Sequence, residues 1–299
     1  MPSITAARRC PDLIFVKPRF NRYRDISHHI RDIFNQYTDL VEPLSLDEAY
    51  LDVTTNKKGM SSATQIAREI RAQIWKEVEL TASAGISINK FLAKVASDIN
   101  KPDGITLIPP DRAETFIEKL PIEKFFGIGK VTAKKMKRMG IRTGLDLKSY
   151  TELELAQRFG KMGRHFFRIV RGLDERVVQP NRLRKSVGAE NTFSYDLTRE
   201  DEMLERLQPL TDKVAERLTR MRTAGKTITL KIKFEDFTQT TRSKTLPKYV
   251  HLSGEITPII QALLNQPIFP EKPVRLLGVY MSNLDNETDG LPRQLTLDF

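Results

Sequence analysis

The sequence lacks the features of secreted, membrane-spanning and disulfide-stabilised proteins. Its one cysteine, Cys10, cannot form an internal disulfide, which fits a reducing compartment. No apolar run is long enough to cross a bilayer, and residues 1–11 lack the apolar core of a signal peptide. We therefore expect a cytoplasmic protein, in which Cys10 is a small buried residue because no other metal ligand is spaced near it.

The sequence also lacks the patterns of nucleophilic hydrolases and of repeat proteins. Its four histidines are isolated from any triad-like arrangement with Ser, Cys or Asp, and no segment repeats. The single tryptophan, Trp75, falls within a helical pattern and is expected to pack against the protein.

Positive charge is concentrated in the middle of the 299-residue chain. The formal net charge is +11, and residues 119–190 carry 18 Lys/Arg against 7 Asp/Glu, which accounts for all of it. A basic segment between neutral flanks is typical of proteins that bind a polyanion, although a merely soluble basic face has the same composition. An excess of this size favours nucleic acid as the partner.

Apolar periodicity and turn residues divide the chain into three folded regions. Residues 1–110 alternate strands and helices around a hairpin, which indicates an α/β or α+β domain. Residues 111–178 are typical of short helices broken by glycines, and a polar linker follows at 179–185. Residues 186–283 predict a βαββαβ domain, and residues 284–299 a flexible tail. The elements expected in the first region lie at 13–16 (a buried strand), 20–37 (helix), 41–53 (hairpin), 62–78 (helix), 81–87 (strand, with Gly85 allowing close approach of another backbone), 89–100 (helix) and 105–108 (strand).

Two adjacent carboxylates, Asp47 and Glu48, lie between two short apolar runs. Val41–Leu46 and Tyr50–Val53 are each typical of a strand, with the acids at the bend. Neighbouring side chains of a regular strand point to opposite faces, so only a turn or strand end would bring both carboxylates to one site. Paired acids at a hairpin tip suit Mg²⁺, which prefers oxygen ligands. The alternative is a solvated acidic turn.

A basic helix is predicted over Asn89–Asn100. Lys90, Lys94 and Lys101 follow at spacings of four and seven residues, so they share one face, opposite an apolar stripe. Lysines at the end of a buried helix can hold a triphosphate as point charges. The alternative is a solvated basic face on which Asp98 pairs with Lys94.

A glycine turn, Gly127-Ile128-Gly129-Lys130, opens a helix that is expected to run to Met139 and to stop at Gly140. Glycines let a backbone approach a phosphate, and a helix N-terminus directs free N–H groups at it. The turn resembles a helix-hairpin-helix motif, which grips phosphates without reading bases, and its glycine spacing is too short for a Walker P-loop. The lysines around it are Lys130, Lys134, Lys135 and Lys137.

A strand at 227–234 and its hairpin partner, which runs to Lys244, carry apolar residues on one face. Lys231, Lys233 and several hydroxyls are expected on the other face, and Arg242 is assigned to it as well. Such a face suits a phosphate backbone, but a solvated sheet face is the usual alternative.

The last residues of the chain form an apolar peptide after a stretch that contains glycine and proline. Gln294, Leu295, Leu297 and Phe299 on a flexible tether suit a small apolar pocket on a partner. The alternative is a frayed terminus with chance leucines.

Four motifs of the chain occur in the order found in the Y-family translesion DNA polymerases, specifically the bacterial DNA polymerase IV group. Essentially the whole chain resembles this group. The resemblance implies an incomplete polymerase palm over 1–110, a small helical thumb with a helix-hairpin-helix over 111–178, and a βαββαβ little-finger domain. The motifs are Ser-Leu-Asp-Glu-Ala-Tyr-Leu-Asp at 45–52, Lys-Phe-Leu-Ala-Lys at 90–94 with Asn-Lys-Pro at 100–102, Gly-Ile-Gly-Lys at 127–130, and Arg-Lys-Ser-Val-Gly at 184–188.

The resemblance also implies an activity: transfer of dNMP from a dNTP to a primer 3′-OH with two Mg²⁺ ions, in error-prone translesion synthesis. Asp47 then corresponds to a metal ligand, Glu48 to the second acid beside the attacking hydroxyl, and Lys101 to a lysine that holds the triphosphate. The tail corresponds to a sliding-clamp peptide, and the protein is expected to work as a monomer. The residues expected to contact primer–template DNA are Gly127, Gly129, Lys130, Arg184, Lys185, Lys231, Lys233 and Arg242.

The chain departs from the family pattern at its beginning. The family starts with a strand carrying Asp-x-Asp-x-Phe, followed by the fingers, and Met1 aligns just after them. Residues 1–9 are typical of a helix entered partway, so we expect that an upstream segment is missing through start-site assignment or deletion.

Two-metal chemistry needs carboxylates that bridge both ions. We therefore expect little or no polymerase activity from this chain, and an exposed palm core. The alternative is a non-catalytic DNA- and clamp-binding remnant. A metal-dependent nuclease fits less well, because it leaves Lys101 and the tail unexplained.

Overall fold

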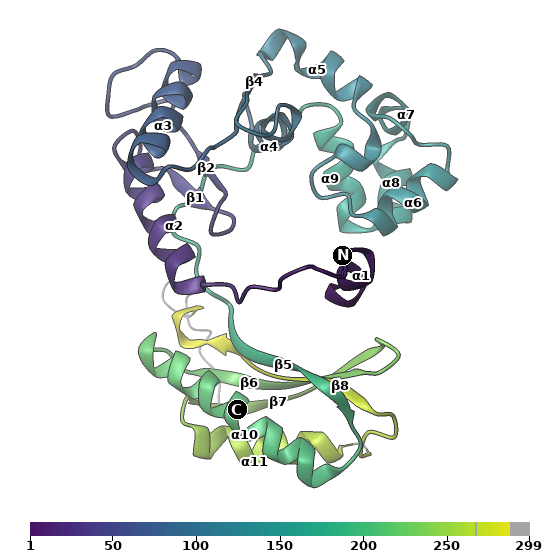
Figure 1. Ribbon diagram of the computed structural model, residues 1–299. Coiled ribbons are helices and arrows are strands. Elements are labelled where there is room, and N and C mark those ends of the chain that lie inside the picture. Colours follow the sequence, from purple (N-terminus) through teal and green to yellow (C-terminus); the bar gives the residue numbers. More distant parts are fainter. Residues whose placement is uncertain (267, 288–299) are drawn as a thin grey trace, which may run out of the picture. The chain divides into compact units, whose positions relative to one another are not determined.

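The apolar residues gather into separate cores in two units of the chain, Met1–Asn181 and Arg182–Phe299. The structure, a computed structural model, describes residues 1–266 and 268–287 (Figure 1). Within these ranges no helix is both long and apolar enough to cross a bilayer. Each unit is described by itself.

The first part of unit one combines helices with two small sheets. Its elements are α1 (Ser3–Arg9), α2 (Phe20–Asn35), β1 (Val41–Pro43), β2 (Ala49–Leu51), α3 (Ala63–Val78), β3 (Ala84–Ile86), α4 (Lys90–Ile99) and β4 (Ile105–Leu107). β1 pairs antiparallel with β2, and β3 pairs parallel with β4. α2 and α3 pack together through Ile33, Tyr37 and Ile70, which are buried. The predicted alternation of strands and helices around a hairpin is confirmed from α2 onward.

Gly85 of β3 lies directly against the backbone of α4. A Cβ atom at this position would be 2.0 Å from the carbonyl oxygen of Ala93 and 2.3 Å from the amide nitrogen of Ser97. The prediction that Gly85 permits close approach of another backbone is therefore confirmed. α4 itself begins at Asn89, whose side-chain oxygen accepts the Leu92 N–H over 3.0 Å.

The second part of unit one is a cluster of short helices. They are α5 (Pro110–Lys119), the 3₁₀ turn η1 (Ile122–Lys124), α6 (Lys130–Arg138), α7 (Gly144–Lys148), α8 (Glu152–Phe159) and α9 (Lys161–Ile169). Capping boxes at Thr143 and Thr151 open α7 and α8, and Gly140 follows α6 with a φ of +83°. The core of the cluster includes Phe91 and Leu92, so the apolar side of α4 packs against these helices. The predicted helices with glycine breaks are confirmed.

Unit two is a four-stranded antiparallel sheet with two helices on one face. Its elements are β5 (Ser186–Leu197), α10 (Glu200–Arg220), β6 (Gly225–Phe234), β7 (Gln239–Val250), α11 (Ser253–Asn265), β8 (Val274–Leu284) and the 3₁₀ turn η2 (Asp285–Glu287). The strand order is β5-β8-β6-β7. α10 packs on β5 and β8, and α11 on β6 and β7 (Figure 1). The predicted βαββαβ order is confirmed, and among the described residues of unit two no helix covers the opposite face of the sheet (the open face).

Three expectations for unit one are wrong. Residues 13–16 are exposed and form no strand, because no strand of the described residues pairs with them. Cys10 is exposed. Trp75 is 59% exposed, because the buried side of α3 is filled by isoleucines such as Ile70.

Candidate catalytic site and nucleic-acid interface

The acidic hairpin forms as predicted, with both carboxylates at its tip. The Leu44 N–H donates to the Glu48 carbonyl over 2.8 Å, which closes the turn between β1 and β2. The hydroxyl of Ser45 donates to Asp47 Oδ1 over 2.6 Å. Asp47 is exposed, and the Glu48 side chain is 39% exposed. Both carboxylates are therefore open to a ligand from solvent.

Lys94 of α4 joins this acidic tip to the helix. Its ammonium lies 3.2 Å from Glu48 Oε1 and 3.4 Å from Asp98 Oδ2. The ammonium also lies 5.6 Å from the centre of the Phe126 ring, and only 11% of the Lys94 side chain is exposed. Lys94 therefore balances the charge of the hairpin from a fixed position.

Lys101, just after α4, shares this electrostatic environment. Its ammonium lies 2.5 Å from Asp98 Oδ1. That hydrogen bond raises the pKa of Lys101, and the negative charges of Glu48 and Asp47 add to the effect. Partial burial acts to raise the pKa of Asp98, but the bond from Lys101 and the charge of Lys94 outweigh it, so the pKa is lowered. The structure thus brings two acids of the hairpin together with two lysines of the predicted basic helix.

The turn that follows Lys101 is held by Arg71 of α3. The Nη2 atom of Arg71 donates to the carbonyl of Asp103 over 2.6 Å and to its carboxylate over 2.5 Å, and Nε donates to the carbonyl of Ala82 over 2.6 Å. Asp103 has a φ of +52°, a left-handed conformation that Asp tolerates better than most residues. Arg71 therefore fixes the turn that presents Lys101.

Lys90 does not join this group, contrary to the prediction. It is 9% exposed, and its ammonium donates to Glu42 Oε2 and to the carbonyl of Val177, the latter over 3.1 Å. The backbone N–H of Gln179 donates to the same Glu42 oxygen over 2.8 Å. A buried carboxylate requires a charged or hydrogen-bonding partner, and Lys90 supplies it from the first turn of α4. This buried pair ties β1, α4 and the segment after α9 together beneath the acidic tip.

Tyr50 of β2 faces the same buried pair. It lies opposite Glu42 in the hairpin register, and the Lys90 ammonium is 5.0 Å from its ring centre. Burial raises the pKa of Tyr50 to about 12, with the charge of Arg176 opposing this and that of Asp174 adding to it. In the described part of the chain, its buried hydroxyl has no hydrogen-bond partner.

Asp174 fastens the segment after α9 to the beginning of α4. Its carboxylate accepts the Phe91 N–H over 3.0 Å and two hydrogen bonds from Arg176, over 2.6 and 2.8 Å. Burial opposes ionisation, but the bonds and charge of Arg176 and the Phe91 N–H lower the pKa of Asp174 overall. A carboxylate at a helix N-terminus is also favoured by the helix dipole.

The acidic tip supplies part of a two-metal site. Asp47 and Glu48 offer carboxylate oxygens, the ligands that Mg²⁺ prefers. Over residues 1–266 and 268–287, no group of three or more His, Cys, Asp or Glu side chains is placed to hold a metal. Since a metal pair needs carboxylates that bridge both ions, these two acids do not by themselves fit one.

The glycine turn has the open geometry of a phosphate site. Gly127 has a φ of +92°, and Gly129 precedes the first residue of α6. Both are exposed, and a Cβ atom at either position would meet nothing within 4 Å. A shallow hollow of about 440 Å³ lies on α6, lined by Glu123, Lys130, Ala133, Lys134, Lys137 and Arg138. The positive side chains and the open helix start lie on the same element, as the motif predicts.

The open face of the sheet in unit two carries hydroxyls and lysines. Thr227 pairs with Thr245 and Thr229 with Ser243, and each pair shares a hydrogen bond, over 2.9 and 2.8 Å. Lys231 and Lys233 continue the same alternation along β6. Arg184 and Lys185 are exposed just before β5. These residues lie where the sequence placed them.

Arg242 lies on the other face of the sheet, so its assignment to the polar face is wrong. It is opposite Leu230, which is fully buried against the helices. Its guanidinium donates to the carbonyls of Leu263, over 3.0 Å, and Leu264 at the end of α11. Residues directly opposite on paired strands share a face, and the open helix end supplies acceptors for the half-buried Arg242.

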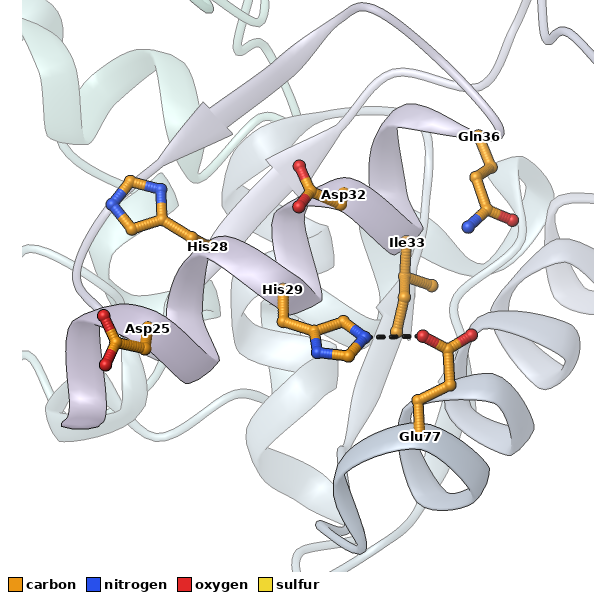
Figure 2. Close-up of a pocket in the computed structure, with 7 residues that line it drawn as sticks. All are labelled: Asp25, His28, His29, Asp32, Ile33, Gln36 and Glu77. Carbon is orange, nitrogen blue, oxygen red and sulfur yellow. Dashed lines mark hydrogen bonds and ion pairs between the residues drawn. The ribbon is translucent and has the colours of Figure 1, made fainter.

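A second hollow of about 490 Å³ lies between α2 and α3 (Figure 2). Figure 2 shows His29 of α2 facing Glu77 of α3, and their side chains are 2.6 Å apart. Hydrogen bonds from Gln73 and His29 lower the pKa of Glu77. The hollow therefore contains a His29–Glu77 hydrogen bond that joins two helices, and the acidic hairpin contributes none of its lining residues.

The predicted clamp-binding residues Gln294, Leu295, Leu297 and Phe299 lie outside the described residues. Clamp binding by the tail therefore stays a prediction.

Comparison with known proteins agrees with this geometry. Family models described as the impB/mucB/samB family, the IMS family HHH motif and the impB/mucB/samB family C-terminal domain match residues 1–98, 110–141 and 184–297. The chain belongs to the impB/mucB/samB family. This family comprises the Y-family polymerases that the motifs resemble, so the expected family is confirmed.

Relatives in the family are similar over most of their length. DNA polymerase IV of Alkalilimnicola ehrlichii is 53% identical over 297 residues, which is 99% of this chain and 83% of the relative. DNA polymerase IV 2 of Agrobacterium fabrum is 54% identical over 97% of this chain and 81% of its own. Among solved structures, a Y-family DNA polymerase chimera of Dbh and Dpo4 has a TM-score of 0.87 and 27% identity, covering 95% of this chain and 83% of the other.

Proposed function

We propose that this chain is a DNA-directed DNA polymerase of the translesion, error-prone type whose activity is weak in the 299-residue chain itself, with 1–110 as the palm, 111–178 as the thumb and 186–283 as the little finger. The observation that carries the proposal is the meeting of Asp47 and Glu48 with Lys94 and Lys101. Acids that can ligate a divalent metal, beside lysines that can hold phosphates, suit transfer of a nucleotide to a primer 3′-OH. Family membership supports the same reaction.

Each residue of the site has a distinct proposed role. Asp47 would be a ligand for Mg²⁺, and Glu48 would be the acid beside the attacking hydroxyl. Lys101 holds the dNTP triphosphate as a point charge, and Lys94 holds Glu48 in place. Arg71 is a positioning residue, because it fixes the turn after Lys101.

Primer–template DNA is the proposed macromolecular substrate. Gly127 and Gly129 accept a phosphate at the start of α6, with Lys130 beside them. The open sheet face, with Lys231 and Lys233, follows the sugar–phosphate backbone. Similarity to an insertion ternary complex of Dbh DNA polymerase, at a TM-score of 0.60 and 26% identity, is consistent with such a substrate. These contacts position DNA without reading its sequence.

Clamp binding, the oligomeric state and the cellular location are also proposals. Gln294, Leu295, Leu297 and Phe299 would place two leucines and a terminal Phe in an apolar pocket of a sliding clamp. The protein is expected to act as a monomer in the cytoplasm, where a single cysteine is kept reduced.

A second candidate function is non-catalytic binding of DNA and the clamp. It is favoured by the number of acids at the hairpin, since two carboxylates are fewer than a metal pair requires. We therefore expect the 299-residue chain, assayed by itself, to incorporate nucleotides weakly or not at all.

Primer extension and DNA binding, measured together on the 299-residue chain, test both candidates. With Mg²⁺ and dNTPs on a primed template, we expect salt-sensitive DNA binding and little extension. Robust extension that is lost in Asp47→Asn and Glu48→Gln would support the polymerase and contradict the expected weakness. Absence of DNA binding would contradict both candidates.

A further inference from the structure

Glu190 is an acidic residue on the sheet face that we propose for DNA. It lies on β5 opposite Gly278 of β8, and Gly278 lies opposite Lys231 of β6. These three residues therefore form a row across three strands of the open face. Lys231 Nζ is 2.8 Å from Glu190 Oε2, and the hydroxyl of Tyr280 donates to the same oxygen.

Two glycines make this arrangement possible. A Cβ atom on Gly278 would lie 3.0 Å from the Glu190 Cβ and 3.5 Å from the Lys231 Cβ, so a larger residue would separate the pair. A Cβ atom on Gly188 would be 2.1 Å from the ring of Tyr280, which lies across that glycine. Glu190 and Lys231 therefore reach each other over the intervening strand β8, held by Tyr280 from the side.

Glu190 is ionised at neutral pH and remains accessible. The hydrogen bonds from Lys231 and Tyr280 lower the pKa of its carboxyl. Burial and the bond to Glu190 raise the pKa of Tyr280 to about 12, so the phenol keeps the proton that it donates. The side chains of Glu190 and Lys231 are 41% and 23% exposed, which leaves the pair open to an incoming anion.

We propose that Glu190 competes with DNA phosphate for Lys231 and so limits how tightly the sheet face binds DNA. The inference rests on the proposed DNA-binding function of this face. When DNA lies on the sheet, a phosphate replaces the Glu190 carboxylate as the partner of Lys231, while Tyr280 retains Glu190. The face then binds less tightly than its lysines alone would allow, because part of their charge is already neutralised.

Neutralising Glu190 should therefore free Lys231 for one more phosphate contact. By counterion release, one extra contact steepens the dependence of log K on log salt by about 0.9 and tightens binding about fivefold at 0.15 M salt. Glu190→Gln keeps an oxygen that can accept from Tyr280 and Lys231. If the pair only stabilises the sheet, this substitution leaves the salt dependence unchanged.

The test is binding of a fluorescent primer–template duplex by the 299-residue chain between 0.05 and 0.3 M salt, roughly the range in which such contacts are resolved. The variants are Glu190→Gln, Lys231→Met, Lys233→Met and the double variant Glu190→Gln/Lys231→Met. Glu205→Gln is the matched control, because Glu205 is exposed on α10, which covers the other face. Circular dichroism melting confirms that each variant is folded.

We expect Glu190→Gln to bind about fivefold tighter with a steeper salt slope, Glu205→Gln to change binding less than about twofold, and the double variant to match Lys231→Met. The inference is overturned if Glu190→Gln behaves like Glu205→Gln, or if the double variant still gains affinity over Lys231→Met. Unchanged binding in both Lys231→Met and Lys233→Met would instead overturn the proposed role of this face in DNA binding.

Discussion

Glu42 and Glu190 are both strand glutamates that accept a hydrogen bond from a lysine, yet their surroundings differ. Glu42 is 5% exposed and Lys90 9% exposed, and backbone groups of Val177 and Gln179 add hydrogen bonds to the pair. Glu190 and Lys231 lie on an open sheet face. Removing one member of a buried pair leaves an uncompensated charge, whereas an exposed pair exchanges readily with other ions. The first pair therefore supports the hairpin, and the second is available to a ligand.

The strongest test of this comparison removes the buried lysine. Lys90→Met should lower the free energy of unfolding by about 3–5 kcal/mol, because Glu42 stays buried and loses its ion pair with Lys90. The matched change in the exposed pair, Lys231→Met, should cost less than about 1 kcal/mol. Urea unfolding followed by circular dichroism measures both. Equal losses in the two variants would show that burial does not separate the two pairs.

Gly85 extends the comparison from charge to close packing. Gly85→Ala should destabilise unit one by about 1–3 kcal/mol or more, because the added Cβ atom collides with the backbone of α4. Urea unfolding followed by circular dichroism measures this loss of stability. A melting curve equal to that of the wild type would mean that β3 and α4 are less closely packed than the structure indicates.

The pH dependence of stability tests the contribution of the buried Asp174 carboxylate. Its pKa in the folded protein is below the ordinary value of 3.8, so the unfolded chain binds the proton more readily. Its contribution to stability is therefore complete above pH 4 or so and is lost as the pH falls through the folded pKa. Stability curves between about pH 6 and 2.5 should show Asp174→Asn less stable than the wild type at pH 6, with the difference shrinking in acid. Stability curves that run parallel for the wild type and Asp174→Asn over this pH range would contradict the lowered pKa of Asp174.

Gly129→Ala tests the exposed glycine turn and should have the smallest effect of these substitutions. Gly129→Ala meets nothing within 4 Å and has a φ of −75°, so stability should not change. The added methyl group would stand where a phosphate approaches the start of α6, so DNA affinity should fall about fivefold, the value of one phosphate contact. Duplex binding at fixed salt measures this. Unchanged affinity would remove the glycine turn from the proposed DNA surface.

Sequence patterns predicted the elements that depend on neighbours in the chain. The alternation along β6, the glycine after α6 and the bend that carries Asp47 and Glu48 all result from local spacing. The order βαββαβ could be predicted because every strand of that sheet lies within unit two. Residues 13–16 have the same apolar character, but no strand of the described residues pairs with them, and they are exposed.

The supporting residues of the site could not be predicted in this way. Arg71 contacts Asp103 across 32 positions, Lys90 contacts Glu42 across 48, and Lys231 contacts Glu190 across 41. Periodicity within a helix placed Lys90 with Lys94, although only the fold determines which carboxylate each of them reaches. Arg242 was misplaced because residue types alone do not reveal the register of a hairpin.

Binding of a dNTP with Mg²⁺ to the chain on primer–template DNA tests most directly whether the acidic hairpin and the end of α4 form one nucleotide site. Calorimetry should show binding in the wild type that weakens at least about tenfold, or 1.4 kcal/mol, in both Lys101→Met and Asp47→Asn. Lys134→Met, on helix α6, which is proposed to bind DNA, should leave dNTP affinity unchanged once DNA is bound. Equal dNTP affinity in the wild type, Lys101→Met and Asp47→Asn would contradict the proposed site.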